Sequence, residues 1–200
     1  KIGGCEAKTD IDFCKKILTN GIVAPMVESE FALQKFIEST INIKDIDLYI
    51  NMESKTAYEN LDNILNSSSS KLLKGIIVGR SDLTKSFGYS KDYVDSPFMH
   101  DIVYKALNKI KQYGLTTLMG GNISPKSSTF IKQLYKEKLL NYIETRNIII
   151  QLNDNNINNL NNTIKSSLLF ESEWLNYKAF YYNQIGDQYT IRSSTILDRL

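Results

Sequence analysis

The sequence predicts an α/β fold in which a parallel sheet is covered by helices. Short apolar runs alternate with longer amphipathic runs along most of the 200 residues, and this alternation is typical of repeated strand–helix units. The strand-like runs are almost continuously apolar, as expected for strands that are buried on both faces. Two of these runs also end on a carboxylate, which indicates a polar rim at one end of the sheet.

The strand-like runs are recognised by their aliphatic residues, and they occupy 1–4, 21–27, 47–53, 73–83, 115–121 and 147–152, with 73–83 running into a loop. Apolar residues at helical spacing predict helices over 29–40, 56–65, 96–114 and 124–140. The third helix has clear ends, because Ser96 is a typical N-cap, Pro97 suits the first helical position and Gly114 suits the end. The last of these helices has the same Ser-Pro start.

The composition excludes several classes of protein. Hydrophobic residues make up 42% and charged residues 23%, which is ordinary for a globular protein. The net charge of +2 is too small to favour a nucleic acid or a membrane surface as a partner. No apolar run reaches the roughly 18 residues of a membrane-spanning helix. Cys5 and Cys14 do not form a CxxC pair, so reduced thiols in a cytoplasmic protein are expected.

The C-terminal part breaks the alternation. The sequence divides into a strand–helix region over 1–152, an asparagine-rich linker over 153–162 and a helical extension over 163–200. Within the extension, a helix is predicted over 163–185, with an aromatic stripe at helical spacing formed by Phe170, Trp174, Tyr177 and Tyr181. This helix either packs on its own body or on a neighbouring subunit, or it forms a lid over a site.

The two acids that end strands are Glu53 and Asp82. They are 29 residues apart, about one strand–helix unit, which in a parallel sheet places both at the carboxyl ends of neighbouring strands. Two carboxylates on one rim repel each other, and Mg²⁺ or Mn²⁺ bound between them would cancel the repulsion. The alternative is that Glu53 is a favourable charge at a helix start and that Asp82 caps a turn.

Two further features of the sequence are candidates for the same rim. Gly120 and Gly121 lead into a helix that starts at Ser124, and such a turn either binds a carboxylate or phosphate or is simply tight. Glu28 is interpreted as a cap of the following helix or as a support for the site.

Two further candidates are assigned to the structure rather than to the site. Glu144 and Arg146 precede the last strand and are expected at the opposite end of the sheet, as a structural ion pair. His100, the only histidine, is expected at the surface of a helix.

Three phrases of the sequence occur together in one family. "GIVAPMVES", "INMESKTAYENLDNI" and "GIIVGRSDLTKSFG" resemble, in this order and spacing, the strand ends of the HpcH/HpaI aldolase and citrate lyase beta-subunit family. The resemblance covers roughly residues 1–130. It implies a (β/α)8 TIM barrel of the phosphoenolpyruvate/pyruvate-binding type, with the first two strand–helix units lying before Lys1. It also implies a cytoplasmic homo-oligomer.

The resemblance further implies a chemistry. Glu53 and Asp82 correspond to acids that hold Mg²⁺ or Mn²⁺, which stabilises the enolate of a 2-oxo acid or acyl thioester while a carbon–carbon bond is made or broken. Gly120, Gly121 and Ser81 are then expected to bind substrate. The family commonly has an arginine in the strand that "KIGG" matches, and here the nearest residue is Lys1. Lys1 and Arg80 are expected to be catalytic, although Arg80 either binds a substrate carboxylate or simply pairs with a surface acid. The alternative is a barrel that has lost this chemistry and binds a small carboxylate or a protein partner.

Overall fold

The computed structural model describes residues 1–43 and 45–200. One sheet has its strands in the order β1 (Gly21–Ala24), β2 (Asp47–Met52), β3 (Gly75–Gly79), β4 (Thr116–Gly120), β5 (Tyr142–Glu144) and β6 (Ile149–Gln151). The first five strands are parallel, and β6 pairs antiparallel with β5. The main helices are α1 (Lys8–Lys16), α2 (Glu30–Thr40), α5 (Arg80–Ser86), α6 (Pro97–Gln112), α7 (Ser128–Lys136) and α9 (Leu160–Leu197). Shorter helices are α3 (Lys55–Glu59), α4 (Leu61–Asn66), α8 (Asp154–Ile157) and the 3₁₀ turns η1 (Ser68–Leu72), η2 (Lys91–Asp95) and η3 (Pro125–Ser127).

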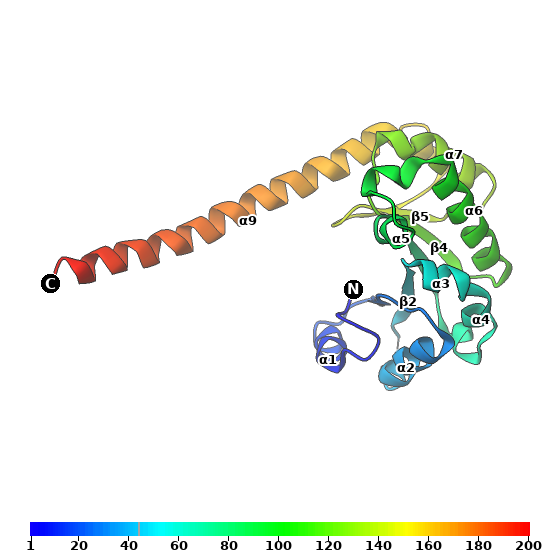
Figure 1. Cartoon of the computed structure of the whole chain (residues 1–200), viewed down its shortest axis with the longest axis horizontal. Coiled ribbons are helices and arrows are strands. Elements are labelled where there is room, and N and C mark those ends of the chain that lie inside the picture. Colours follow the sequence, from blue (N-terminus) through cyan, green and yellow to red (C-terminus); the bar gives the residue numbers. More distant parts are fainter. Residues whose placement is uncertain (44) are drawn as a thin grey trace.

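The sheet curls into an open half-barrel, and helices cover its outer face (Figure 1). The core lies between these two layers, because alternate strand residues such as Ile22, Ile50, Ile76 and Met119 point outward and are buried beneath the helices. The mixed α/β architecture that the alternation predicts is therefore confirmed. Among the residues that the structure describes, no helix is long and apolar enough to span a membrane.

The N-cap predicted at Ser96 is confirmed, and α2 starts on a serine of the same kind, Ser29. The Ser29 hydroxyl accepts a hydrogen bond from the Ala32 N–H at 3.1 Å, and the Ser96 hydroxyl accepts one from the Met99 N–H at 3.2 Å. Gly114 ends α6 with a φ of 72°, a conformation that glycine adopts readily. Because Ser29 is the cap of α2, the interpretation of Glu28 as that cap is wrong.

Several local predictions differ from the structure. Residues 1–4 are not a strand, although the Ile2 N–H donates to the Val23 carbonyl at 3.0 Å and so lies along β1. The helix predicted over 56–65 is divided into α3 and α4 at Asn60, whose side chain donates to the Glu28 carbonyl at 2.9 Å. The loop expected at the end of 73–83 is the start of α5, since Gly79 ends β3 and the helix begins at the next residue.

The largest correction concerns residues 142–151. The sequence predicts one strand over 147–152 that continues the parallel order, but two short strands form an antiparallel pair, with Ile143 opposite Ile150. Glu144 therefore ends the parallel strand β5, next to β4, and does not lie at the opposite end of the sheet. No ion pair to Arg146 is found among the residues that the structure describes.

The asparagine-rich segment is also more regular than predicted. Residues 154–157 form α8, whose cap Asn153 accepts hydrogen bonds from the N–H groups of Asn155 and Asn156, and α9 begins at Leu160. Asparagine is a favoured N-cap, so the same composition that indicates a loop also starts helices. The predicted C-terminal helix is confirmed, and it is longer than expected at 38 residues.

Candidate functional site

Glu53 is the centre of the polar rim. It directly follows β2, is only 4% exposed, and its carboxylate accepts hydrogen bonds from three groups. Lys1 Nζ lies 3.2 Å from Oε1 and 3.0 Å from Oε2, the Met26 N–H donates to Oε1 at 3.1 Å, and Asn51 Nδ2 donates to Oε2 at 2.8 Å. A buried carboxylate is stable only when its charge is matched in this way.

Two backbone positions, Met26 and Gly79, help to hold Glu53 in place. Met26, in the loop after β1, has a φ of 53°, which is strained for a residue with a side chain and turns its N–H toward Glu53. Gly79 ends the neighbouring strand, and a Cβ there would lie only 2.9 Å from the Glu53 Cβ and 3.1 Å from its Oε2. The position of the Glu53 carboxylate thus depends on a glycine in β3.

Glu144 is a second carboxylate on this rim that sequence reasoning missed. Burial raises the pKa of Glu144, Lys1 lowers it and Glu53 raises it, so the three side chains share one electrostatic environment. A Cβ on Gly120 would lie 2.5 Å from Glu144 Oε1, so the glycine of β4 makes room for this carboxylate. The usable signal was the alternation in "YIE", which places Tyr142 and Glu144 on the same face of a strand.

Asn51 is a further residue of this rim that the sequence does not single out. It lies two positions before Glu53 on the same face of β2, and its side chain is buried. While its amide nitrogen donates to Glu53, no hydrogen-bond partner is found for its Oδ1 in the part of the chain that the structure describes. An unpartnered buried carbonyl oxygen beside a carboxylate is an oxygen donor available to a ligand.

Arg80, predicted to act on substrate, is fully buried at the start of α5. Its Nη1 donates to Asp95 Oδ1 at 2.8 Å, its Nη2 donates to the Gly121 carbonyl and to Ser127 Oγ at 3.1 Å each, and its Nε donates to the Gly120 carbonyl at 3.4 Å. Burial lowers the pKa of Arg80, while Asp95 raises it. The guanidinium therefore holds the turn after β4 in place, and its donors are engaged there.

Of the other predicted residues, the structure brings Ser81 and Gly121 together, whereas no contact between Asp82 and Glu53 is found in the described part of the chain. Gly121 has a φ of 82°, and a Cβ there would overlap the backbone nitrogen of Ser81, so these two residues are in close contact. Asp82 follows in the first turn of α5, where its side chain is 59% exposed and Oδ1 lies 3.3 Å from Lys85 Nζ. Lys1 and Glu53 are thus paired, Arg80 joins Gly120 and Gly121, and Asp82 pairs with Lys85.

The rim provides some of the oxygen ligands that a hard divalent cation needs. Over residues 1–43 and 45–200, no three His, Cys, Asp or Glu side chains gather closely enough to hold a metal ion. Mg²⁺, however, is usually bound by one or two carboxylates and completes its shell with water and substrate oxygens. Glu53 and Asn51 Oδ1 are adjacent oxygen donors of that kind, and the Lys1 ammonium already bridges both oxygens of Glu53, as a cation would.

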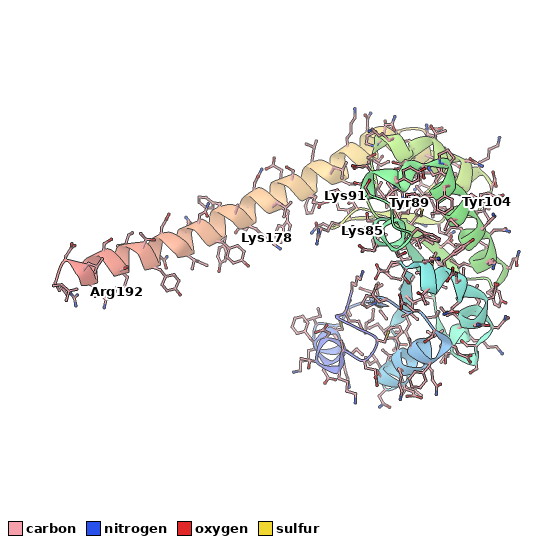
Figure 2. All side chains as sticks on the ribbon, in the orientation of Figure 1. Lys85, Tyr89, Lys91, Tyr104, Lys178 and Arg192 are labelled. Atoms are coloured by element: carbon pink, nitrogen blue, oxygen red, sulfur yellow. The ribbon has the colours of Figure 1, made fainter. Side chains whose placement is uncertain are left out.

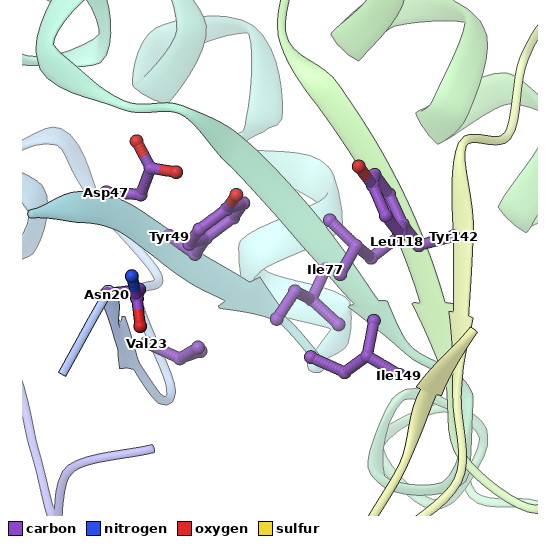
Figure 3. Close-up of a pocket in the computed structure, with 9 residues that line it drawn as sticks. Asn20, Val23, Asp47, Tyr49, Ile77, Leu118, Tyr142 and Ile149 are labelled. Carbon is purple, nitrogen blue, oxygen red and sulfur yellow. The ribbon is translucent and has the colours of Figure 1, made fainter. Parts of the chain in front are cut away.

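The inner face of the half-barrel is apolar below this rim. A hollow of about 320 Å³ lies against it and is lined by Asn20, Gly21, Val23, Asp47, Tyr49, Ile77, Leu118, Tyr142 and Ile149. Figure 3 shows Tyr49, Ile77, Leu118 and Tyr142 side by side on neighbouring strands. Tyr49 precedes Asn51 and Glu53 on the same face of β2, so the polar rim stands above an apolar floor.

His100 is half-buried, with 30% of its side chain exposed, so the predicted surface position holds only in part. Its ring stacks on Phe130 with centroids 3.9 Å apart, and Nε2 lies 3.9 Å from Asp95 Oδ1. Burial lowers the pKa of His100, and Asp95 opposes this effect. His100 therefore packs beside the Arg80–Asp95 pair rather than on the Glu53 rim.

Two solved structures resemble this chain in fold. An HpcH/HpaI aldolase from Desulfitobacterium hafniense DCB-2 matches with a TM-score of 0.54 and 13% identity, over 68% of this chain and 60% of that one. An HpcH/Hpal aldolase/citrate lyase family protein from Burkholderia cenocepacia J2315 matches with a TM-score of 0.54 and 14% identity, over 71% and 63% of the two chains. The chain has the fold of these aldolase-family proteins.

The match covers only part of the known proteins. The aligned region spans about six tenths of the length of both solved chains. No family model and no curated protein matches the sequence. The likeness to known proteins is therefore one of fold.

Proposed function

We propose that the chain belongs to a metal-dependent carbon–carbon lyase, of the aldolase or citrate lyase type, that acts on a 2-oxo acid or an acyl thioester. The observation that carries the proposal is the arrangement at the end of β2, where buried Glu53 lies beside the unpartnered Asn51 Oδ1 on an aldolase-like fold. Ligands of such folds bind at the carboxyl ends of the strands. A closed (β/α)8 barrel, a cytoplasmic location and a homo-oligomer are parts of the same proposal.

In this proposal, Glu53 and Asn51 hold Mg²⁺ or Mn²⁺, with Asp82 as the second acid that the sequence indicates. The bound metal would act as a Lewis acid toward negative charge that develops on a substrate oxygen. Lys1 is half exposed and can turn from Glu53 toward a substrate carboxylate. Glu144, whose pKa burial raises, can hold a proton close to the reacting carbon. Ser81, Gly120 and Gly121 would bind the substrate.

One observation favours a second candidate, a carboxylate-binding protein without metal chemistry. Lys1 contacts both oxygens of Glu53, the position that a metal would take. In that case Lys1 would bind a small carboxylate by itself, as a single positive charge.

Calorimetric titration with Mg²⁺ and Mn²⁺, with and without oxalate as an analogue of the pyruvate enolate, separates the two candidates. The lyase predicts metal binding that oxalate tightens, and its loss in Glu53→Gln and Asp82→Asn. Glu59→Gln, on the exposed surface of α3, is the matched control and should bind as the unchanged protein does. Oxalate binding without metal would favour the second candidate, and no binding of either would overturn the lyase.

A further inference from the structure

A second hollow lies at the end of the sheet opposite the Glu53 rim. Its volume is about 800 Å³, which is in the range of pockets that hold small ligands. Lys111, in the last turn of α6, and Asn141, directly before β5, are among the residues that line it. Since Glu144 ends β5 at the rim, the length of this strand separates the hollow from the candidate site.

Four lysines line this second hollow, and we call them the lysine cluster. They are Lys111, Lys132, Lys136 and Lys138. In the part of the chain that the structure describes, no carboxylate lies within ion-pair distance of any of them. By contrast, Lys105 and Lys109, on the same helix as Lys111, each pair with an aspartate. Ammonium groups that gather around one hollow without a counter-charge attract anions.

Two acidic residues near the lysine cluster have other partners. Asp154 also lines the hollow, and it accepts a hydrogen bond from the Tyr135 hydroxyl at 2.9 Å. Glu137 accepts one from Gln133 Nε2 at 3.2 Å, and a hydrogen bond to Glu137 raises the pKa of Tyr104. Figure 2 shows Tyr104 at the outer surface of the body, on α6. The lining thus has four positive charges and one negative charge.

Lys111 is fixed at the wall of the hollow by Asn141. Its Nζ donates to Asn141 Oδ1 at 2.9 Å, and the same oxygen accepts hydrogen bonds from the N–H and the hydroxyl of Thr117 at 3.0 Å each. Burial lowers the pKa of Lys111, so a bound anion would stabilise its charged form. Over residues 1–43 and 45–200, no acceptor is found for Asn141 Nδ2, so the lining also offers a neutral donor.

Lys138 occupies a backbone position that glycine would suit better. It follows the end of α7 with a φ of 59°, whereas Gly114, with a φ of 72°, follows the end of α6. A positive φ is unfavourable for a residue with a side chain and is kept where the surroundings or a function require it. A lysine at this position supplies a positive charge to the hollow, which glycine could not.

The helix dipole accounts for only part of the lysine cluster. Basic residues in the last turn of a helix are favoured by the partial negative charge there, and Lys111 and Lys136 have such positions. Lys132 is in the middle of α7, and Lys138 lies beyond its end. These two lysines therefore need another explanation.

We propose that the lysine cluster binds the polyphosphate group of a small ligand. Lysine binds phosphate as a point charge, whereas a planar carboxylate is matched by the fork of arginine, and no arginine is among the described residues that line the hollow. Four ammonium groups around a hollow of this size exceed the need of a single phosphate and suit a chain of phosphates. A nucleoside triphosphate and an inorganic polyphosphate carry the same group. The site is independent of the proposed lyase chemistry.

Calorimetric titration of the full chain with tripolyphosphate and with ATP, in metal-free buffer, tests the proposal. We expect saturable binding that Lys132→Met combined with Lys136→Met weakens by at least about tenfold. Lys105→Met combined with Lys109→Met removes the same charge from α6 and should change the affinity by less than about twofold. Tighter binding of ATP would assign the site to nucleotides, and equal affinities would assign it to the polyphosphate alone. No saturable binding of either probe, or equal weakening by both pairs, would overturn the proposal.

Two single substitutions test the location. Lys138→Gly suits the positive φ, so it should keep or raise the melting temperature while it weakens polyphosphate binding by at least about threefold. Full binding by this variant would overturn the assignment of Lys138. Lys1→Met should leave the binding unchanged, and its loss there would place the polyphosphate at the Glu53 rim. Tighter binding of a single-stranded oligonucleotide than of tripolyphosphate would indicate a nucleic-acid surface and would also overturn the proposal.

Discussion

Lys1 and Glu53 form a bridged ion pair, with the lysine nitrogen 3.2 and 3.0 Å from the two carboxylate oxygens. The two residues differ in burial, since the Lys1 side chain is 48% exposed and that of Glu53 is 4% exposed. Glu53 is also fixed by the Met26 N–H and the Asn51 amide. The lysine is thus the one of these three donors that can move away readily.

Lys1→Met should therefore change how the rim binds cations. If Lys1 occupies the position of the metal, its removal should tighten Mg²⁺ binding by about fivefold, since a half-exposed ion pair contributes about 1 kcal/mol. Calorimetric titration measures the change, and Lys8→Met on the exposed side of α1 is the control. Unchanged Mg²⁺ affinity together with weaker oxalate binding would instead assign Lys1 to the substrate.

Gly79→Ala should displace Glu53 by a steric clash, without changing any charge or hydrogen bond. The added Cβ would lie 2.9 Å from the Glu53 Cβ, closer than real side chains approach. We expect a loss of about 1–3 kcal/mol in the free energy of unfolding and weaker metal binding. Denaturant unfolding measures the first effect. Gly4→Ala, where no atom lies within 4 Å of the new Cβ, should leave stability unchanged, and a similar loss there would contradict the steric explanation.

Arg80→Met should lower the free energy of unfolding, because it leaves Asp95 and two backbone carbonyls without their hydrogen-bond partner. Breaking a buried ion pair typically costs about 3–5 kcal/mol. Lys85→Met breaks the exposed pair with Asp82 and should cost less than about 1 kcal/mol. Urea unfolding of both variants gives the comparison. Equal stability of the two variants would show that Arg80 does not hold the turn after β4.

Glu144 should make stability depend on pH. Its pKa is raised in the folded protein, so the folded state binds the proton more tightly than the unfolded chain does. Its contribution to stability is therefore largest below the ordinary glutamate pKa and falls as pH rises through the folded value. Glu144→Gln has no carboxyl group at this position to ionise, so this decline should disappear. The melting temperature of the variant should therefore exceed that of the unchanged protein at neutral pH, and the difference between the two proteins should shrink at acid pH. A parallel pH profile in the two proteins would refute the assignment.

Much of the fold is predictable from local patterns. The capped helices α2 and α6 follow from Ser29, Ser96 and Gly114, because caps are set by neighbouring residues. The strand β2, which ends just before Glu53, follows from its apolar run. The antiparallel pairing of β5 with β6 cannot be predicted from local patterns. Both strands are only three residues long, and their pairing depends on contacts with the rest of the fold.

The site is predictable to a similar extent. Glu53 is identifiable because it ends a buried strand, whereas Glu144 requires the position of β5 to be known. The role of Arg80 is invisible in the sequence, because its partners Asp95, Gly120 and Ser127 lie 15 to 47 residues away. Whether Glu53 and Asp82 bind a metal stays a prediction for the titrations.

The short helix α8 contacts β6, the last strand of the sheet. Strand β6 forms one margin of the sheet, and unpaired margins invite strands of other molecules to add. Asn156 Nδ2 donates to the Gln151 carbonyl at 2.5 Å, which occupies an acceptor that a foreign strand would need. With only three residues in β6, little template remains. A side chain of the asparagine-rich segment thus occupies part of the outer margin of β6, which leaves fewer backbone groups there for a strand of another molecule.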